Sequence, residues 1–410
     1  MQKFNLYLDR MELIHRNLLI GIHDALEETF FQDKKYADKV LERLLKAHKK
    51  WGSVDRQVVS EIFYDMVRWK KRLEYYMGEG TKPSNIYNLI LAYLLWKKVK
   101  YKKFDEFDGI KTGGILSKLD KKTFPTKAIE HSVPDWLAGL FEKELGAKWE
   151  KEMSALNEQA PVILRANSLK ISAENLVEIL KEEGVNSFVL RGYPDAVQLE
   201  EKKNVFLTSA FKEGFFEVQD ASSQKIAELL DVKVGMRVVD ACAGAGGKTL
   251  HIAALMKNKG QIIALDIYEW KLAELKRRAK RAGAFNIETR FIEDNKVIKR
   301  LHNTADRLLI DAPCSGLGVL KRNPDSKWKI DEDFINRIKT EQENILQNYS
   351  KILKKGGKMV YATCSILPSE NGEQVRKFLA ENAEFALVKE ESIMPSDGYD
   401  GFYMALIERK

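Results

Sequence analysis

Residues 238–249 read VVDACAGAGGKT. The stretch begins as an apolar strand that ends at Asp240, and Gly244, Gly246 and Gly247 then lead into a helix. Glycine adopts positive φ without strain and lets the backbone approach a ligand, while a helix N-terminus favours an anionic group. The spacing Asp-x-x-x-Gly-x-Gly is not the dinucleotide fingerprint G-x-G-x-x-G. From this loop alone, NAD, FAD, S-adenosylmethionine and an unliganded tight turn all remain open.

The chain around this loop alternates between strands and helices. Strands are predicted at 236–241, 261–266, 287–292, 305–311, 358–363 and 401–408, and helices at 247–257, 269–282, 333–353 and 370–381. This alternation predicts an α/β fold with a doubly wound, mostly parallel sheet. Such sheets bind ligands beyond the carboxyl ends of their strands, which is where candidate site residues are expected.

Charged residues stand at several of these strand ends. Asp266 ends the second strand about 20 residues after the glycines, where nucleoside-binding folds hold ribose hydroxyls. Taken alone it could be a surface carboxylate or a cap for the helix at 269–282. Asp294 follows the third strand, within reach of an adenine amine, and Lys248 could pair with a ligand carboxylate. Together with the glycine loop, these positions favour nucleoside binding.

Two of the three cysteines each follow a predicted strand. Cys314 lies in DAPCSGLGVLKRNPDSKW (311–328) and Cys364 in YATCS (361–365). The ends of parallel strands share one edge of the sheet, so both thiols are candidates for one pocket, whereas Cys242 reads as a small buried side chain. Three dispersed cysteines without nearby histidines lack structural-zinc spacing, so no metal is expected, and there is no C-x-x-C redox pair. Nucleophilic attack by a thiolate fits these thiols best.

The chain before the sheet divides into two predicted segments. Residues 1–150 read as a helical domain, with loops and short pieces at 100–134, where glycine and proline recur. Residues 151–218 read as a small α/β subdomain with a strand in PVILRANSLK, a capped helix and two short strands around Pro194. Residues 219–410 then form the domain with the large sheet.

Composition excludes several classes of protein. The three cysteines in 410 residues are too few for a disulfide framework and indicate free thiols in a reducing compartment. No stretch approaches the roughly 20 apolar residues of a membrane span, and charges interrupt MQKFNLYLDRMELIHR where a secretory signal needs an apolar run. A cytoplasmic protein is therefore expected. The net charge of +8 permits an anionic partner such as nucleic acid.

These motifs resemble the RsmB/Sun family of RNA cytosine-C5 methyltransferases. The resemblance rests on DAPCSG, TCS, AGAGGKT and the tail GFYMALIERK, which lie in the second half of the chain. RANSL at 165–169 is similar to the family's small RRM-like subdomain, and DRQVVSEIFYDMVRWKKRLEYY is similar to the NusB-like RNA-binding domain of the RsmB branch. The resemblance implies a Rossmann-like methyltransferase sheet, S-adenosylmethionine as cofactor and a monomer that acts on small-subunit ribosomal RNA.

The resemblance also implies a role for each motif residue. Cys364 becomes the covalent nucleophile and Cys314 the thiol that assists product release. A carboxyl group near N3 and N4 of the base, for which Asp311 is the candidate, would stabilise charge on the ring. The expected cofactor residues are Cys242, Ala243, Gly244, Ala245, Gly246, Gly247, Lys248, Asp266, Asp294 and Asp311. Many relatives have Ala-Pro-Gly-Gly where this chain has Gly244 to Gly247, so this loop loses a rigid proline.

RNA contacts and rival functions remain open at this stage. Arg165, Lys321 and Arg322 are the basic residues nearest the motifs and are predicted to bind phosphate, although each could equally be a solvated charge. A transfer-RNA substrate is the nearest alternative. A non-catalytic RNA-binding assembly factor and a nicotinamide-dependent oxidoreductase are the alternatives from other classes, and the loop spacing disfavours the latter.

Overall fold

A computed structural model describes residues 14–32, 35–102, 104–121 and 123–410, so the charged stretch at 1–13 lies outside the described residues. The chain forms two compact units, one that runs to Asn157 and includes Leu320–Ile330, and one made of Glu158–Val319 and Asp331–Lys410. The first limit differs from the expected 150 because the helix Trp149–Leu156 continues the helical unit, where Trp149 stacks on Phe141. The segment 158–218 belongs to the same compact unit as the large sheet.

The first unit is helical in its described residues, as expected. Its α-helices are α2 Arg16–Phe31, α3 Ala37–Ala47, α4 Ser53–Arg68, α5 Lys70–Met77, α6 Ile86–Lys97, α7 Thr112–Leu119, α8 Lys127–Glu130, α9 Asp135–Leu145, α10 Trp149–Leu156 and α17 Ser326–Lys329. The most apolar of them, α6, is buried through most of its length. Apolar faces of α2, α3, α4 and α5 pack around it in one core.

A short segment from the second half of the chain completes this helical unit. Trp328 packs against the helical core and donates from Nε1 to the Val67 carbonyl at 2.7 Å. Lys327 is buried and donates to the Arg68 carbonyl at 2.9 Å. The buried Asp325 carboxylate accepts from the N–H of Ala37 at 2.9 Å, the first residue of α3. Polar groups in apolar surroundings need such partners, so these contacts fix the segment to the helices.

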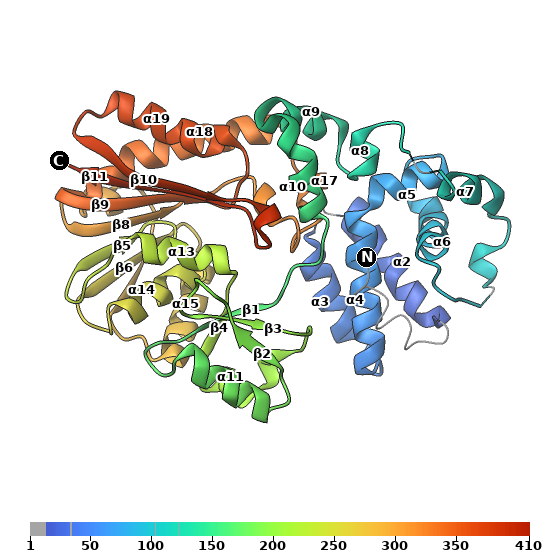
Figure 1. Cartoon of the computed structure of the whole chain (residues 1–410), viewed down its shortest axis with the longest axis horizontal. Helices are drawn as coiled ribbons and strands as arrows, with labels where there is room; N and C mark the ends of the chain where they lie inside the picture. The colour runs from blue at the N-terminus through green and yellow to red at the C-terminus, as the bar shows by residue number, and fades with distance from the viewer. Residues whose placement is uncertain (1–13, 33–34, 103, 122) are drawn as a thin grey trace. The chain divides into compact units, whose positions relative to one another are not determined.

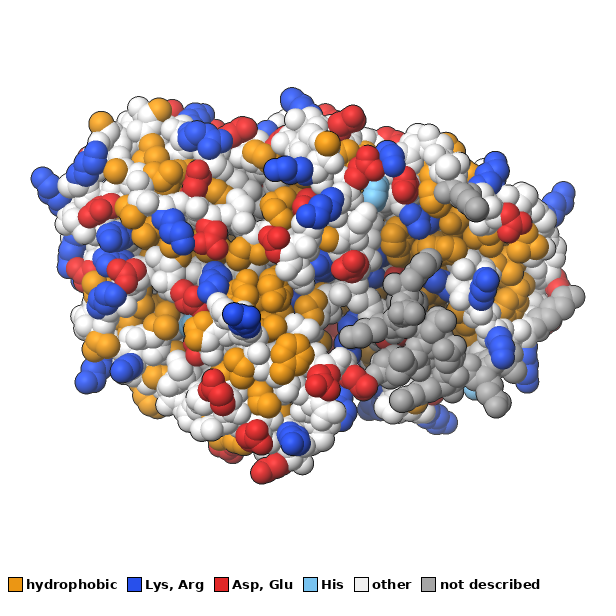
Figure 2. Space-filling model, viewed as in Figure 1, with side chains coloured by type: hydrophobic (Ala, Val, Ile, Leu, Met, Phe, Trp, Pro, Cys, Tyr) orange, Lys and Arg blue, Asp and Glu red, His pale blue; other side chains and the backbone are white. Residues whose placement is uncertain are grey.

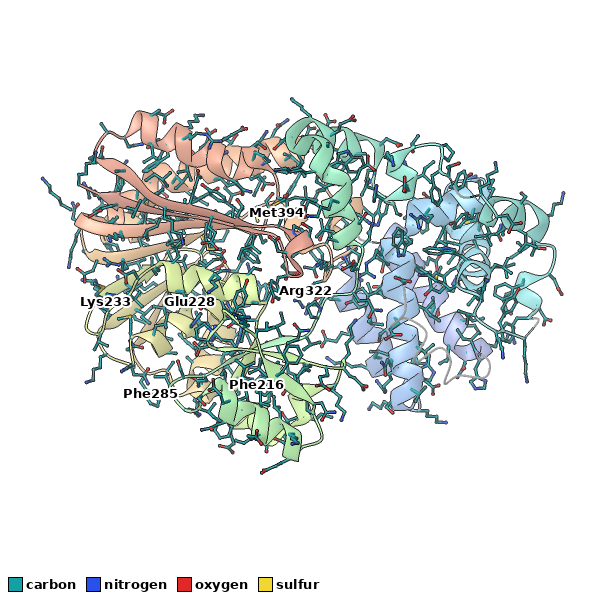
Figure 3. The ribbon with its side chains drawn as sticks, viewed as in Figure 1. Phe216, Glu228, Lys233, Phe285, Arg322 and Met394 are labelled. Carbon is teal, nitrogen blue, oxygen red and sulfur yellow. The ribbon has the colours of Figure 1, made fainter. Side chains whose placement is uncertain are left out.

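The small subdomain is a four-stranded sheet that is antiparallel throughout, in the order β2-β3-β1-β4. Its elements are β1 Ile163–Ala166, α11 Ala173–Glu182, β2 Ser187–Val189, β3 Ala196–Leu199, α12 Ser209–Lys212 and β4 Phe216–Val218. The strand in PVILRANSLK and the strand pair around Pro194 are confirmed, and β4 is an additional strand. Phe216 of β4, labelled in Figure 3, is fully buried in the cluster that α11 forms with this sheet.

The large sheet has seven strands in the order β10-β11-β9-β8-β5-β6-β7, which confirms the doubly wound α/β fold. Neighbouring strands are parallel from β9 through β8, β5 and β6 to β7. By contrast, β11 is antiparallel to both of its neighbours, β9 and β10. Its elements are α13 Ala221–Leu229, β5 Arg237–Asp240, α14 Gly247–Leu255, β6 Gln261–Asp266, α15 Glu269–Ala282, β7 Ile287–Phe291, α16 Asn295–Lys299, β8 Ala305–Asp311, α18 Glu332–Tyr349, β9 Leu353–Thr363, α19 Gly372–Glu381, β10 Phe385–Ile393 and β11 Phe402–Arg409.

Helices cover both faces of this sheet (Figure 1). Successive residues of a strand point to opposite faces, so Val238 of β5 packs with α13, α14 and α15, and Val239 packs with α16, α18 and α19. The same alternation runs through the other central strands. Burial on both faces explains why these strands read as continuous apolar runs.

One strand of the large sheet was not predicted. β10 lies at the edge of the sheet, pairs only with β11 and is exposed over much of its length. Its sequence FALVKEESI carries charges where a buried strand would be apolar, as is common for edge strands.

Figure 2 shows lysine and arginine side chains interspersed with aspartate and glutamate on one face of the molecule. Among the described helices, none combines the length and the apolar character needed to cross a bilayer.

Replacement of Asp325 by alanine is expected to destabilise the helical unit by about 1–3 kcal/mol, because the buried Ala37 N–H loses its acceptor. The measurement is urea unfolding followed by tryptophan fluorescence, since every tryptophan except Trp270 lies in this unit. The Asp325→Asn variant retains an acceptor oxygen, so its free energy of unfolding should fall by much less. Equal midpoints for Asp325→Ala and the unmodified protein would show that this contact does not contribute.

Candidate functional site

The two cysteines predicted to share a pocket lie side by side. β8 and β9 are adjacent and parallel, and the chain reaches Cys314 and Cys364 just beyond their carboxyl ends. Their sulfur atoms are 3.3 Å apart, within hydrogen-bonding distance for thiols. The hydrogen bond to Cys364, together with burial, raises the pKa of the Cys314 thiol well above its usual value. Cys314 therefore keeps its proton and can donate it to a Cys364 thiolate.

Lys248 and Asp311, which were assigned separate roles from the sequence, form an ion pair. Lys248 Nζ and Asp311 Oδ2 are 2.6 Å apart, and the lysine side chain is 12% exposed. Burial lowers the pKa of Lys248, but the Asp311 carboxylate and a nearby charge on Cys364 raise it, and the net pKa is above the usual value. A permanent ammonium at this place stabilises negative charge on the groups around it.

Asp266 and Asp294 lie at the ends of neighbouring strands but have different surroundings. Asp266 is buried, and its two carboxylate oxygens accept from the N–H groups of Gly244 and Tyr268, each at 2.8 Å. It therefore ties the glycine loop to the end of β6. Asp294 is exposed and caps α16 by accepting from the N–H of Lys296 at 2.7 Å.

The glycine loop needs its glycines for two different reasons. Gly246 has φ of 87°, and a Cβ there would lie 2.5 Å from Leu275 Cγ. Gly244 also has positive φ, at 55°, but a Cβ at Gly244 or Gly247 would meet no atom within 4 Å. This open space above the loop backbone is what a cofactor that approaches the main chain requires. The residues present therefore fit such a group.

The remaining loop residues are held from within the sheet domain. The N–H of Ala243 donates to the Leu265 carbonyl at 2.8 Å, which aligns the loop with β6. Cys242, expected to be buried, is partly exposed, and desolvation raises the pKa of its thiol well above the usual value. At the end of β5, burial also raises the pKa of Asp240 to about 7, and one of its oxygens accepts from Thr249 Oγ1 at 2.7 Å.

Two arginines that the sequence did not connect with the loop hold its carbonyl groups. Arg278 of α15 donates to the Ala245 carbonyl at 2.8 Å, and Arg165 of β1 donates to the Gly247 carbonyl at 2.6 Å. Arg278 is also paired with the buried Glu217 of β4 at 2.9 Å. Two residues of the small sheet thus support the loop at the end of β5. Nothing in the local sequence marks these contacts, since the partners are far apart in the chain.

Two of the three predicted RNA contacts are buried in the structure, whereas the third is partly exposed. Arg165 is 2% exposed, and burial lowers the pKa of its guanidinium to about 10, so it remains a cation inside the fold. Lys321 is 3% exposed, and its carbonyl accepts from Arg68 at 2.9 Å. Neither side chain is presented to an RNA phosphate in this structure, because both are buried. Arg322 is partly exposed and is labelled in Figure 3.

No group of three or more histidine, cysteine, aspartate or glutamate side chains suited to a metal ion occurs in the part of the chain that the structure describes.

Comparisons with known proteins identify relatives of this chain. A family profile described as 16S rRNA methyltransferase RsmB/F matches residues 227–406, and an RsmF/B-like ferredoxin-like domain profile matches residues 133–206. Ribosomal RNA small subunit methyltransferase B of Proteus mirabilis is 36% identical over 282 residues, which cover 68% of this chain and 66% of that protein. A probable ribosomal RNA small subunit methyltransferase B of Synechocystis is 30% identical over 388 residues, 85% of this chain and 86% of that one.

Solved structures show the same fold. The crystal structure of PH0851 superposes with a TM-score of 0.82 at 26% identity, over 97% of this chain and all of that chain. The similarity therefore extends over the sheet domain, the small subdomain and the helical unit.

Gly246→Ala is expected to destabilise the protein by about 2–4 kcal/mol, since the new Cβ meets Leu275 and the backbone has positive φ. Thermal unfolding followed by circular dichroism, without any ligand, measures this. Gly247→Ala is the matched control, because its Cβ meets open space at the start of α14 and should change stability by less than about 1 kcal/mol. Equal losses in both variants would contradict the steric explanation.

Proposed function

Because the chain belongs to the 16S rRNA methyltransferase RsmB/F family, a family of S-adenosylmethionine-dependent enzymes, we propose that it methylates C5 of a cytosine in small-subunit ribosomal RNA. The reaction would pass through a covalent bond between a cysteine sulfur and C6 of the base. An RNA of the small subunit as substrate implies a cytoplasmic protein.

The observation that carries this proposal is the pair of thiols 3.3 Å apart at the ends of β8 and β9. C5 of cytosine is a weak nucleophile because its ring is aromatic and electron-deficient. Addition of the Cys364 thiolate to C6 forms a carbon–sulfur bond and makes C5 enamine-like. This covalent step divides one difficult substitution into an addition and an elimination.

S-adenosylmethionine, when bound, supplies the methyl group that the activated C5 attacks. In the elimination, a base from the solvent accepts the C5 proton, the electron pair of the C5–H bond restores the C5–C6 double bond, and the C6–sulfur bond breaks with its electron pair returning to Cys364 as a thiolate. The Cys314 thiol lies where it can hydrogen-bond to the departing sulfur and so assist its release. Its raised pKa means that it enters the cycle as a thiol.

Asp311 is the proposed partner for N3 and N4 of the base. It stands at the end of β8, three residues before Cys314, and is partly exposed. Its pairing with Lys248 keeps a cation beside the same pocket. A fixed group of this kind stabilises charge that develops on the ring during addition.

The proposed cofactor residues are the loop from Cys242 to Lys248 together with Asp266, Asp294 and Asp311. Open space at Gly244 and Gly247 supports an approach to the loop backbone. Asp266 would hold ribose hydroxyls in exchange for part of its present bonding to the loop. The exposed carboxylate of Asp294 is available for an exocyclic amine.

Cys364→Ser is expected to abolish both methyl transfer and covalent capture, whereas Cys314→Ser should permit addition but slow release. Denaturing electrophoresis with radiolabelled small-subunit RNA and S-adenosylmethionine should then reveal a slow, nuclease-sensitive adduct with Cys314→Ser only. The Cys314/Cys364 double variant is the control and should give none. Normal turnover by Cys314→Ser would contradict its role in release.

The same assay distinguishes the alternative substrates. We expect an adduct with small-subunit RNA and not with transfer RNA, as the names of the relatives suggest. An adduct with transfer RNA alone would retain the mechanism and change the substrate. No adduct with any RNA, and no methyl transfer by the unmodified protein, would favour a non-catalytic RNA-binding assembly factor.

A further inference from the structure

A single buried carboxylate contacts the residue that follows each thiol. Glu370 is fully buried. Its Oε1 accepts from the hydroxyls of Ser315 at 2.5 Å and Ser365 at 2.7 Å. Its Oε2 accepts from the N–H of Ser315 at 2.8 Å and from Nε2 of Gln342 at 3.1 Å. A carboxylate out of water is costly unless donors replace its hydration, and these four donors do so.

The position of Glu370 is itself fixed by the surrounding structure. Its carbonyl accepts from the Tyr361 hydroxyl of β9 at 2.8 Å. The next residue, Asn371, donates from Nδ2 to the Ser365 carbonyl at 2.9 Å. Gln342 of α18, which donates to Glu370, also donates to the Pro313 carbonyl at 2.9 Å, just before Cys314. The carboxylate is therefore anchored on β9 and α18, and both thiol-bearing loops are attached to it.

The loops need such an anchor because both thiols lie beyond the regular strands. β8 ends at Asp311 and β9 at Thr363, so strand pairing no longer determines where the sulfurs lie. Apart from the thiol pair, two bonds join the two loops directly, one from the Gly318 N–H to the Cys364 carbonyl at 2.9 Å and one between the hydroxyls of Ser315 and Ser365 at 3.2 Å. The contacts of Glu370 are more numerous and reach the neighbours of both cysteines.

We propose that Glu370 is a positioning residue that sets the separation of Cys314 and Cys364. It touches neither sulfur in the contacts above and acts through Ser315 and Ser365. Its consequence for catalysis rests on the proposed function, in which both thiols act on one base. A misplacement of about 1 Å in such a pair can lower the rate on the order of 100-fold.

The separation of the thiols can be measured without RNA or S-adenosylmethionine. Diamide oxidises two neighbouring thiols to a disulfide while its N=N bond is reduced to a hydrazine, which accepts both protons and both electrons. Disulfide bonds form only within a narrow geometry, so the rate reports how the sulfurs are placed. Mass spectrometry of peptides containing Cys314 and Cys364 identifies the product, and alkylation of Cys242 controls for general exposure of thiols.

Glu370→Ala removes all four contacts and should slow formation of this disulfide on the order of tenfold or more. Glu370→Gln should react nearly as the unmodified protein does. Its amide oxygen can accept from the Ser315 N–H and Gln342, and its NH₂ can donate to both serine hydroxyls. Glu373→Ala is the matched control, since Glu373 is exposed in the same segment.

Circular dichroism and equilibrium binding of S-adenosylmethionine test whether each variant is folded. The glycine loop makes no contact with Glu370 in the bonds described, so a folded variant should bind S-adenosylmethionine as the unmodified protein does. If Glu370→Ala does not fold, the Ser315→Ala/Ser365→Ala double variant takes its place, since it removes both hydroxyl links and keeps the carboxylate with its bond to the Ser315 N–H, so a smaller but measurable slowing is expected. Equal disulfide rates in a folded loss variant and the unmodified protein would overturn the proposal. So would the absence of any disulfide in the unmodified protein.

Methyl transfer provides the second readout. Glu370→Ala should lower kcat on the order of 100-fold with little change in KM for S-adenosylmethionine, and Glu370→Gln should restore most of it. Unaltered kcat in Glu370→Ala would overturn the positioning role while the proposed function stands. If the unmodified protein methylates no RNA but its disulfide rate depends on Glu370, the positioning role stands and the proposed function fails.

Discussion

The parallel pairing of β8 with β9 is the constraint on which the candidate site depends. Asp311 pairs in register with Ala362, so the chain leaves both strands at the same edge of the sheet and within a few residues of Cys314 and Cys364. A shift of this register by one residue would turn every side chain of the shifted strand to the opposite face of the sheet. Its residues would then no longer fit the two apolar clusters that pack on those faces. The register is therefore set by burial on both faces, and the core of the sheet brings the two thiol-bearing loops to one edge.

Beyond the strands, buried polar contacts take over from backbone pairing. Glu370 joins the two thiol loops, while Arg278 and Arg165 hold carbonyl groups of the glycine loop. Glu370 and Arg165 are charged groups buried in the protein, where hydrogen bonds are needed to offset lost hydration, while Arg278 is partly exposed. Such contacts are directional, so they define loop positions that apolar packing alone would leave variable.

The sequence predicted the central strands well because their burial leaves a local signal. β6 and β8 begin and end at the predicted residues, and both are apolar runs. β10 left no such signal, since an exposed edge strand can carry charges along its length. The cysteines could be paired because each follows a strand. The role of Arg165 could not be predicted from the sequence, because basic residues usually lie at the surface and its partner Gly247 is 82 residues away.

Glu370 is a second residue whose role could not be predicted from the sequence alone. Its segment SENGE lies at the start of the helix predicted at 370–381, and only the fold brings it to Ser315, 55 residues earlier in the chain. A local pattern can identify residues that carry chemistry, because thiols and strand-end carboxylates are recognisable by type. A local pattern cannot identify the residues that hold these groups in place, because the tertiary structure determines which partners such residues contact.

The ion pair between Lys248 and Asp311 links the two halves of the site. Lys248 belongs to the helix that follows the glycine loop, and Asp311 precedes Cys314 on β8. A ligand carboxylate that binds Lys248 competes with Asp311 for the same ammonium, and a base that binds Asp311 competes with Lys248 for the same carboxylate. A charge on Cys364 also raises the pKa of Lys248. In the proposed mechanism, binding of the cofactor at the loop and formation of a Cys364 thiolate would therefore be coupled through one cation, which neither motif reveals when read alone.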